Sequence, residues 1–180
     1  MTLQESNEIG WFSLSNPPDV LQNKITFTNP EHEPDGIWLN EAGTLVCTAG
    51  EYDGTIGVHT LDASGKPSTQ LFIRLADDLP SNWDWDDKRK GIEPEEVVIA
   101  EAGGKSFVLT TLQDAGAVVV YDITDPANPK YDSGAITELN DYTSQTDGES
   151  IGEPEGLAFK NGYVLVSNGD DPSVALLKSS

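Results

Sequence analysis

Three stretches of this chain read Glu33-Pro34-Asp35-Gly36-Ile37-Trp38-Leu39, Glu93-Pro94-Glu95-Glu96-Val97-Val98-Ile99 and Glu153-Pro154-Glu155-Gly156-Leu157-Ala158-Phe159. They start at intervals of 60 residues, and in each an acidic turn around a proline leads into an apolar triplet. Self-similarity at a fixed interval is the mark of a repeat architecture. The acidic turn therefore predicts a tandem repeat. Glu96 departs from the pattern, because the other two copies have glycine at that position.

The likeness continues behind each turn. Glycine turns at Gly43, Gly103-Gly104 and Asn161-Gly162 precede short segments rich in β-branched and aromatic residues, as is typical of an antiparallel meander. The predicted second strands span residues 44–48, 106–111 and 163–167, the third strands 56–61, 118–123 and 174–177, and the fourth strands 70–75 and 131–136. No segment shows the periodicity of an amphipathic helix, so the sequence predicts an all-β protein.

The repeats predict a partial β-propeller of about three four-stranded blades. Residues 1–180 then form a single partial propeller with repeats at 33–92, 93–152 and 153–180, and residues 1–32 end a preceding blade. Because propellers typically need four to eight blades to close a ring, two explanations stay open. We favour a chain that is the C-terminal portion of a longer propeller over one that pairs with another copy. Residues 24–27 are expected to supply the missing outer strand of the last repeat.

The chain is strongly acidic, with 31 Asp and Glu against 10 Lys and Arg, a net charge of −21 and a pI near 4.1. Such a surface repels nucleic acid and anionic lipid, so neither is an expected partner. No long apolar run and no signal peptide is visible, and membrane insertion is not expected. Cys47 is the single cysteine, which excludes an intrachain disulfide and a thiolate metal cage.

Acidic residues at repeated positions are the leading candidates for a functional site. In a propeller the strand behind such a turn is usually the innermost, so the turn carboxylates are expected to converge near one mouth of the channel. A second set lies between the second and third strands of each repeat. Hard oxygen ligands select Ca²⁺ or Mg²⁺. The candidate metal ligands are Glu33, Asp35, Glu93, Glu95, Glu153 and Glu155 in the turns, and Glu51, Asp53, Asp114, Asp170 and Asp171 in the loops.

Turn chemistry is a simpler explanation of the same residues, and from the sequence alone we favour it. Proline fixes the entry to a strand, and a carboxylate accepts backbone N–H groups in a turn. An EF-hand spacing is absent, so a divalent site has to be assembled from separate blades.

The other catalytic templates are missing from the sequence. It has no P-loop, no dinucleotide-binding glycine pattern and no G-x-S-x-G elbow, so no organic cofactor and no catalytic residue is predicted. His32 and His59 fall in unrelated parts of the repeat. His59 belongs to an alternating strand and is expected to face solvent or a satisfied polar contact.

Several motifs follow one another in the order found in a known family. They are Thr2-Leu3-Gln4-Glu5, the acidic loop after Thr48-Ala49-Gly50-Glu51, the stretch from Asp86 to Glu95, Val120-Tyr121-Asp122-Ile123-Thr124-Asp125-Pro126-Ala127-Asn128-Pro129, and the acidic turn that begins at Glu153. In these motifs the chain resembles the choice-of-anchor I proteins, which include mesenchyme-specific cell-surface glycoproteins associated with biomineralisation and bacterial members labelled alkaline phosphatase. The likeness covers nearly the whole chain and the C-terminal half of the family's usual length. It implies an exported, often surface-attached β-propeller.

Together these features predict a non-catalytic secreted or cell-surface module. If its carboxylates act as ligands and not in turn chemistry alone, the module binds Ca²⁺ and contacts a surface or mineral, holding anionic phosphate or mineral through these cations. The expected protein partners are the missing propeller blades or another copy of the chain. The alternative is a Ca²⁺-dependent phosphomonoesterase. It rests on the family label and on the likeness of residues 163–170 to segments of β-propeller phytases, in which metal ions neutralise the phosphate and activate water.

Overall fold

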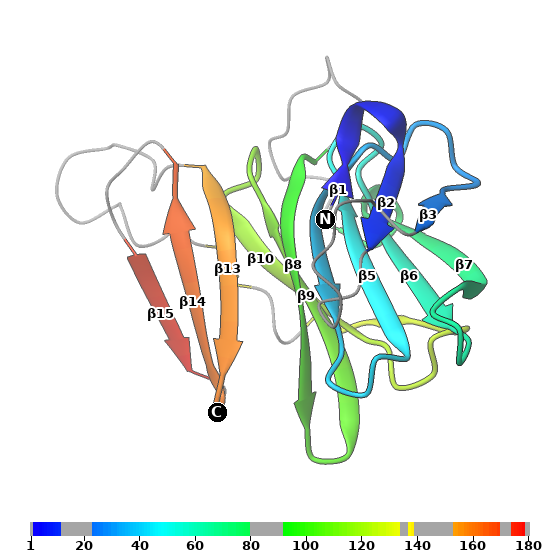
Figure 1. The fold of residues 1–180 in the computed structure, drawn as a ribbon. Coiled ribbons are helices and arrows are strands. Elements are labelled where there is room, and N and C mark those ends of the chain that lie inside the picture. Colours follow the sequence, from blue (N-terminus) through cyan, green and yellow to red (C-terminus); the bar gives the residue numbers. More distant parts are fainter. Residues whose placement is uncertain are drawn as a thin grey trace, which may run out of the picture.

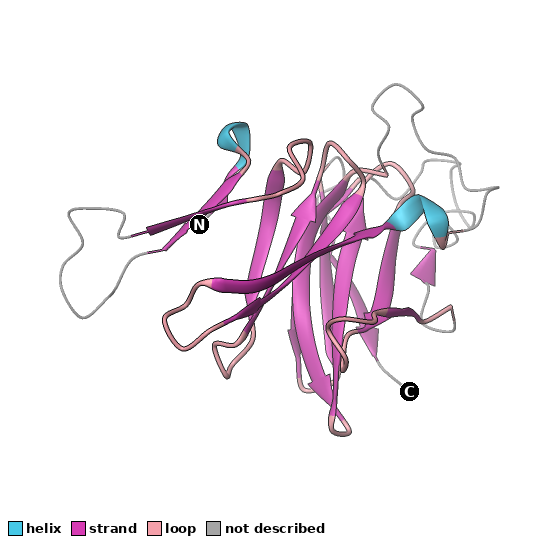
Figure 2. Ribbon diagram, turned by 90° about the vertical axis from the view of Figure 1, so that its right-hand side faces the viewer, coloured by secondary structure: helices cyan, strands magenta, loops and turns pink. Residues whose placement is uncertain are grey.

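The computed structural model describes residues 2–11, 23–79, 92–133, 137–138, 153–169 and 174–178. Over these residues the protein consists of short antiparallel strands in four small sheets, and its helical structure is limited to two 3-10 turns, η1 (Gln4–Ser6) and η2 (Leu75–Asp77) (Figures 1 and 2). The all-β prediction is therefore confirmed for this part of the chain. Within it, no helix is long and apolar enough to cross a membrane.

The sheets follow one another along the chain, and each is a meander of neighbouring strands. The first sheet contains β1 (Thr2–Leu3), β2 (Glu8–Trp11) and β3 (Asn23–Thr26). The second contains β4 (Pro34–Leu39), β5 (Leu45–Gly50), β6 (Thr55–Leu61) and β7 (Pro67–Arg74). The third contains β8 (Pro94–Ala102), β9 (Lys105–Leu112), β10 (Ala117–Asp122) and β11 (Lys130–Tyr131), and β12 (Thr137–Glu138) also pairs with β10. The fourth contains β13 (Pro154–Lys160), β14 (Tyr163–Asn168) and β15 (Val174–Lys178).

Most strands lie where the sequence predicts them. Behind each acidic turn the second and third strands are present, and β7 is the fourth strand of the second sheet. The role predicted for residues 24–27 is wrong, because β3 pairs with β2 in the first sheet, with Ile25 opposite Ile9. The cause is burial, since Ile25 and Phe27 cover apolar residues of the second sheet. The strand predicted at residues 131–136 is described only as β11, and residues 134–136 lie outside the described part.

Each of the middle two sheets is buried on both faces, because it packs between two neighbours. We call the face that a sheet turns toward the next sheet in the chain its forward face, and the opposite face its rear face. In the third sheet Val97 and Val108 lie on the rear face, whereas the adjacent residues Val98 and Leu109 lie on the forward face. Successive side chains of a strand point to opposite faces, so continuous apolar runs mark this sheet as covered on both sides.

The same forward-on-rear contact joins all four sheets (Figure 1). From the first sheet, Ile9, Ile25 and Phe27 pack on Val46 of the second. From the second, Cys47, Ala49, Ile56 and Val58 pack on Val97, Val108 and Val119 of the third. From the third, Val98, Leu109 and Val118 pack on Leu157, Val164 and Val166 of the fourth. In consequence the first strands of successive sheets, β1, β4, β8 and β13, are neighbours.

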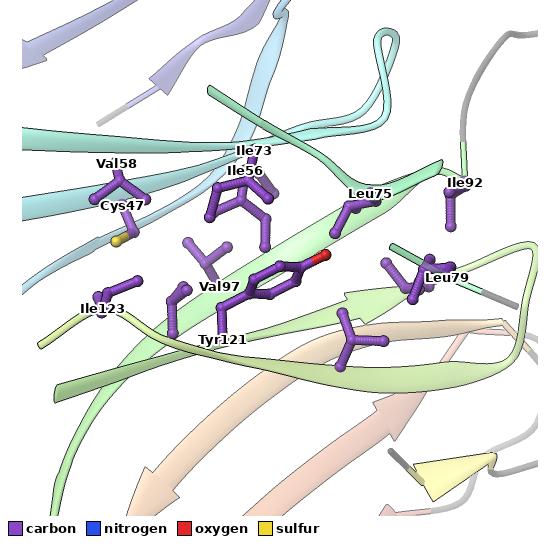
Figure 3. Close-up of a cluster of buried hydrophobic side chains, with 14 of the residues drawn as sticks. Cys47, Ile56, Val58, Ile73, Leu75, Leu79, Ile92, Val97, Tyr121 and Ile123 are labelled. Carbon is purple, nitrogen blue, oxygen red and sulfur yellow. The ribbon is translucent and has the colours of Figure 1, made fainter. Parts of the chain in front are cut away.

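Tyr121 anchors the contact between the second and third sheets. Its ring lies among Leu75, Val97 and Ile123 (Figure 3), and its hydroxyl donates to Asp78 Oδ2 at 3.2 Å. Burial, together with the charge of Asp78, raises the pKa of this phenol. A buried tyrosine usually finds a polar partner for its hydroxyl, and here that partner fixes the chain just after η2.

Candidate functional site

The acidic turns lie at the entry to the first strand of a sheet, and two of the three share a left-handed glutamate. Strand pairing is interrupted by a β-bulge just after each turn proline, in β4, β8 and β13. Glu33 and Glu93 both stand in the left-handed region, with φ of 41° and 45°. A non-glycine residue there costs about 1–2 kcal/mol, and strain of this kind gathers at functional sites. Two repeats therefore hold a strained glutamate at the same position.

Backbone hydrogen bonds hold these turns in place. The carbonyl oxygen of Glu93 accepts from the N–H of Gln113 at 2.9 Å, and that of Glu153 accepts from the N–H of Gly169 at 2.7 Å. Both bonds tie the first residue of a turn to the loop that follows the second strand. They engage the backbone of the turn and leave its carboxylates to other interactions.

Two of the turns bring their carboxyl groups together. Glu95 of β8 forms a side-chain hydrogen bond with Asp35 of β4, across the contact between the third and second sheets. Burial, the bond to Asp35 and the charge of Asp35 together raise the pKa of Glu95 to about 8, and burial is the largest of these causes. The negative charges of Glu51 and Glu93 act in the same direction. At neutral pH Glu95 is therefore mostly protonated and donates its O–H to the Asp35 carboxylate.

Glu96 belongs to the same group, although it breaks the sequence pattern. Its carboxylate accepts from its neighbour Val97 N at 2.9 Å and from the N–H of Ile37 in the second sheet. Burial and the charge of Asp35 nevertheless raise its pKa. Gly36 makes room for it: a Cβ on Gly36 would lie 2.7 Å from Glu96 Oε1 and 2.5 Å from the carbonyl oxygen of Glu95. Glycine in the first turn and glutamate in the second are thus complementary.

Glu51 joins this group from the loop between β5 and β6. Its side chain is held by a hydrogen bond from Gln4 Nε2, which comes from the 3-10 turn of the first sheet. Three sheets therefore contribute to one place. We call this group, made of Asp35, Glu51, Glu93, Glu95 and Glu96, the carboxylate cluster.

The third acidic turn forms a separate group of contacts. Gln113 Nε2 donates to Glu153 Oε2 at 3.1 Å, and Thr111 Oγ1 donates to the carbonyl oxygen of Glu155 at 3.1 Å. The Glu155 carboxylate lies against Gly169, where a Cβ would come within 2.5 Å of Oε1. These contacts fasten the turn of the fourth sheet to the third sheet.

Asp53 is half-buried among polar side chains at the end of the second sheet. It accepts from Asn29 Nδ2 and from Thr55 Oγ1, the latter at 2.7 Å, and its Oδ1 lies 3.6 Å from His32 Nδ1. Of the other loop candidates, Asp114 is half-buried in the turn between β9 and β10. Asp170 and Asp171 lie outside the described residues.

The two histidines converge beside Asp53. Of the two environments expected for His59, solvent is excluded by its burial, and the polar contact is present at Thr48. His32 is fully buried and His59 is 1% exposed. Thr48 Oγ1 lies 2.7 Å from His32 Nε2 and 3.4 Å from His59 Nε2. The His59 ring stacks on Phe27 with centroids 4.9 Å apart, and its Nδ1 is buried without a hydrogen-bond partner. Burial and the proximity of His32 lower the pKa of His59 to about 3.

Sequence patterns alone point to neither Glu96 nor the histidine pair. For Glu96 the usable signal is Gly36, because a glycine at one copy of a repeat makes room for a larger side chain from the next. For the histidines the usable signal is the place of His59 in its strand, which puts it on a covered face of the sheet. His59 lies opposite Val46 in the ladder of β5 and β6, on the covered rear face of the second sheet.

Chemically, the carboxylate cluster is a set of oxygen donors in which Glu95 carries a proton at neutral pH. When that proton leaves Glu95, the remaining charge repulsion favours a hard cation, and Ca²⁺ prefers such ligands. Among the described residues, no group of three or more acidic, His or Cys side chains is already arranged to hold a metal ion. Neither the known protein-family models nor the curated proteins contain a match to this chain.

The raised pKa of Glu95 predicts a loss of stability at alkaline pH. An acid whose pKa is higher in the folded state stabilises the fold while it is protonated, and that contribution is lost as pH rises from about 4.5 to about 8. Substitution Glu95→Gln keeps a hydrogen-bond donor toward Asp35 without the charge. The unfolding temperature of the wild type, measured with chelator present, should therefore decrease as the pH is raised from 5 to 9. The unfolding temperature of the Glu95→Gln variant should decrease less.

Glu101 provides the matched control, because it is an exposed glutamate on the same strand. The unfolding temperature of the Glu101→Gln variant should depend on pH in the same way as that of the wild type. Equal slopes for the wild type and the Glu95→Gln variant would show that Glu95 titrates normally and carries no shared proton.

The lowered pKa of His59 predicts that the stability of the fold decreases as the pH falls below neutral, whereas the raised pKa of Glu95 lowers stability as the pH rises. A histidine kept neutral by burial stabilises the fold above pH 6.5, and that contribution is lost as pH falls toward 3. His59→Phe keeps the stacking on Phe27 and removes the titrating group. Denaturant unfolding between pH 7 and pH 4 should show a smaller loss of stability in this variant than in the wild type. An unchanged acid slope would refute the burial of a neutral imidazole.

Proposed function

We propose that the protein is a non-catalytic β-propeller module of the secreted or cell-surface kind, and that it binds Ca²⁺ at the carboxylate cluster. The observation that carries this proposal is the Asp35–Glu95 pair, in which two acidic turns from adjacent repeats meet and their carboxyl groups form a hydrogen bond. A fold gains nothing from burying several carboxyl groups together, because like charges in a partly buried site repel one another. A bound cation offsets that cost.

The propeller assignment is supported by how the sheets pack. Four small meanders follow one another with the same forward-on-rear contact, and their first strands are neighbours. Repetition of one interface with a constant sense around a set of small sheets is how propeller blades are arranged. Placement outside the cell rests on the resemblance to the choice-of-anchor I proteins.

The donor set of the cluster fits Ca²⁺. Asp35, Glu51, Glu93 and Glu95 offer carboxylate oxygens and no thiolate or imidazole, which disfavours the softer transition metals. Glu95 has to lose its proton before both of its oxygens can accept a cation. Binding is therefore expected to strengthen as pH rises toward 8.

Calcium also accounts for the surface or mineral contact within this proposal. A chain with a net charge of −21 repels phosphate and other anions. Cations held by its carboxylates reverse that local charge and allow an anionic surface to approach. The expected ligands are therefore a mineral or a phosphate-bearing surface, reached through bound Ca²⁺.

Calcium should raise the thermal unfolding midpoint of the wild type, and chelator should reverse the effect. A ligand that binds the folded state alone, at a concentration of about 100 times its dissociation constant, stabilises it by about 2.7 kcal/mol. The double substitution Asp35→Asn and Glu95→Gln should abolish the shift, and the Glu101→Gln control should retain it. A shift of equal size in the double variant would show that calcium binds at another place on the protein.

The same samples separate this proposal from the phosphomonoesterase alternative. Incubation with p-nitrophenyl phosphate should give no turnover, with or without Ca²⁺. Turnover that disappears with chelator and in the Asp35→Asn, Glu95→Gln variant would show that the cluster is catalytic.

A further inference from the structure

The contact between the first and second sheets encloses two ionisable side chains. Phe27 lies against both histidines, with its ring centroid 4.9 Å from that of His32 and 4.9 Å from that of His59. Phe72 of β7 lies against the same pair, at 4.9 Å from His32 and 5.5 Å from His59. Two buried imidazoles therefore lie between aromatic rings in the middle of a sheet-on-sheet contact.

A chain of hydrogen bonds joins the two imidazoles to Asp53. Thr55 Oγ1 donates to Asp53 Oδ1 at 2.7 Å and lies 2.9 Å from His32 Nδ1. On the other side of the ring, Thr48 Oγ1 lies 2.7 Å from His32 Nε2 and 3.4 Å from His59 Nε2. The chain thus runs from a carboxylate into the apolar interior, and it ends at His59 Nδ1, which has no hydrogen-bond partner.

The position of each proton in this chain follows from its donors and acceptors. A hydroxyl has one hydrogen to donate, and a neutral imidazole has one N–H and one acceptor nitrogen. Since the Thr55 hydroxyl donates to Asp53, the bond between Thr55 and His32 needs the N–H of His32 Nδ1. His32 Nε2 then accepts from Thr48, and Thr48 accepts from His59 Nε2. Every hydrogen of the chain is used, and His59 Nδ1 remains a bare acceptor nitrogen at its buried end.

An additional proton has no place in this chain. An imidazolium ion donates from both ring nitrogens, and on His59 the new N–H at Nδ1 has no acceptor. On His32 the new N–H points at Thr48, which can no longer donate there. Thr48 then either donates to His59 Nε2, which moves the His59 hydrogen to Nδ1, or keeps a hydroxyl hydrogen without an acceptor in the chain. In each case a buried donor is left unpaired, which is costly beside a charge.

The surroundings of His59 do not compensate a positive charge. Asp53 Oδ1 lies 3.6 Å from His32 Nδ1, so its negative charge acts mainly on the nearer ring. In the ladders on either side of β6, His59 lies opposite Val46 and Gln70, and neither of them is charged. In agreement with this geometry, burial and the proximity of His32 lower the pKa of His59 to about 3.

The second sheet makes its smaller apolar contact on the face that carries the histidines. Among the described residues, the cluster between the first and second sheets buries Ile9, Ile25, Phe27 and Val46. The cluster between the second and third sheets is larger, lies on the opposite face and contains no histidine. Separation of the first sheet from the second would therefore bring water to a protonated His59, whereas the contact with the third sheet can stay closed.

We infer that the histidine pair makes the contact between the first and second sheets acid-labile, so that uptake of one proton opens this contact while the second and third sheets stay packed. In the opened state water can accept from both N–H groups of the imidazolium ion. A local opening of this kind is expected where few apolar side chains hold two elements together. Because Gln4 of the first sheet donates to Glu51 of the second, opening also removes that bond from the carboxylate cluster.

Thiol labelling at two buried positions of the 180-residue chain tests this inference. Ile25→Cys places a thiol in the contact between the first and second sheets. Cys47, which is fully buried on the forward face of the second sheet, reports the contact with the third sheet in the same molecule. A dipyridyl disulfide reacts with accessible thiols in acid as well as at neutral pH. Mass spectrometry of peptides then gives the labelling rate at each position, relative to a free thiol at the same pH.

Position 25 should become more reactive in acid, and Cys47 should not. At pH 4.5, two units below the ordinary histidine pKa of 6.5 and above the value of about 3 in the closed state, proton linkage favours the open state about a hundredfold. The relative labelling rate at position 25 should therefore rise about a hundredfold between pH 7.5 and pH 4.5. His59→Phe in the Ile25→Cys background should remove most of this rise.

Glu8 supplies the matched control, because it is an acidic group of the first sheet that pairs with Lys24 on the opposite, rear face. Glu8→Gln in the Ile25→Cys background should keep the full rise. The inference is overturned if position 25 stays unreactive at pH 4.5, if Cys47 becomes reactive together with it, or if the rise persists in the His59→Phe variant. The first two outcomes are read without any change at the histidines, so they hold even where His59→Phe fails to fold.

Discussion

The apolar contact between the forward face of one sheet and the rear face of the next is the interaction on which the rest of the structure depends. Each sheet has three to five short strands, too few to form an independent core, so stability has to come from the neighbouring layer. This requirement explains why Val97 and Val98, adjacent in the chain, are both buried. It also explains why the third sheet reads as an uninterrupted apolar run rather than an alternating one.

The same packing places the carboxylates. Because both faces of the inner sheets are covered by neighbouring sheets, carboxylates gather at strand ends and in turns. Because β4 and β8 are neighbours, the turns that lead into them end up side by side, and Asp35 meets Glu95. The site is therefore a consequence of the repeat. A single acidic turn only leads the chain into a strand, whereas two adjacent turns bring their carboxyl groups into a hydrogen bond. The left-handed Glu93, 6% exposed, adds backbone strain to charge repulsion at the same place.

The strands and turns could be predicted from the sequence, whereas the contacts between repeats could not. Alternating β-branched residues and glycine turns predict the strands, because those signals act within a few residues. Glu96 looks like a defect in the pattern until Gly36 of the preceding repeat is seen to make room for it. Likewise His32 and His59 are far apart in the repeat and come together around Thr48, where Phe27 contacts both rings. The pairing of β3 with β2 was also beyond a local reading, since it follows from burial of Ile25 and Phe27.

Proton release on calcium binding tests the central claim most directly. Titration calorimetry at pH 7, repeated in buffers of different ionisation enthalpy, measures how many protons leave the protein for each Ca²⁺ bound. Since Glu95 is mostly protonated at that pH, the wild type should release about one proton per ion. The Glu95→Gln variant should bind more weakly and release almost none. Calcium binding with no proton release in the wild type, or no binding at all, would contradict the account.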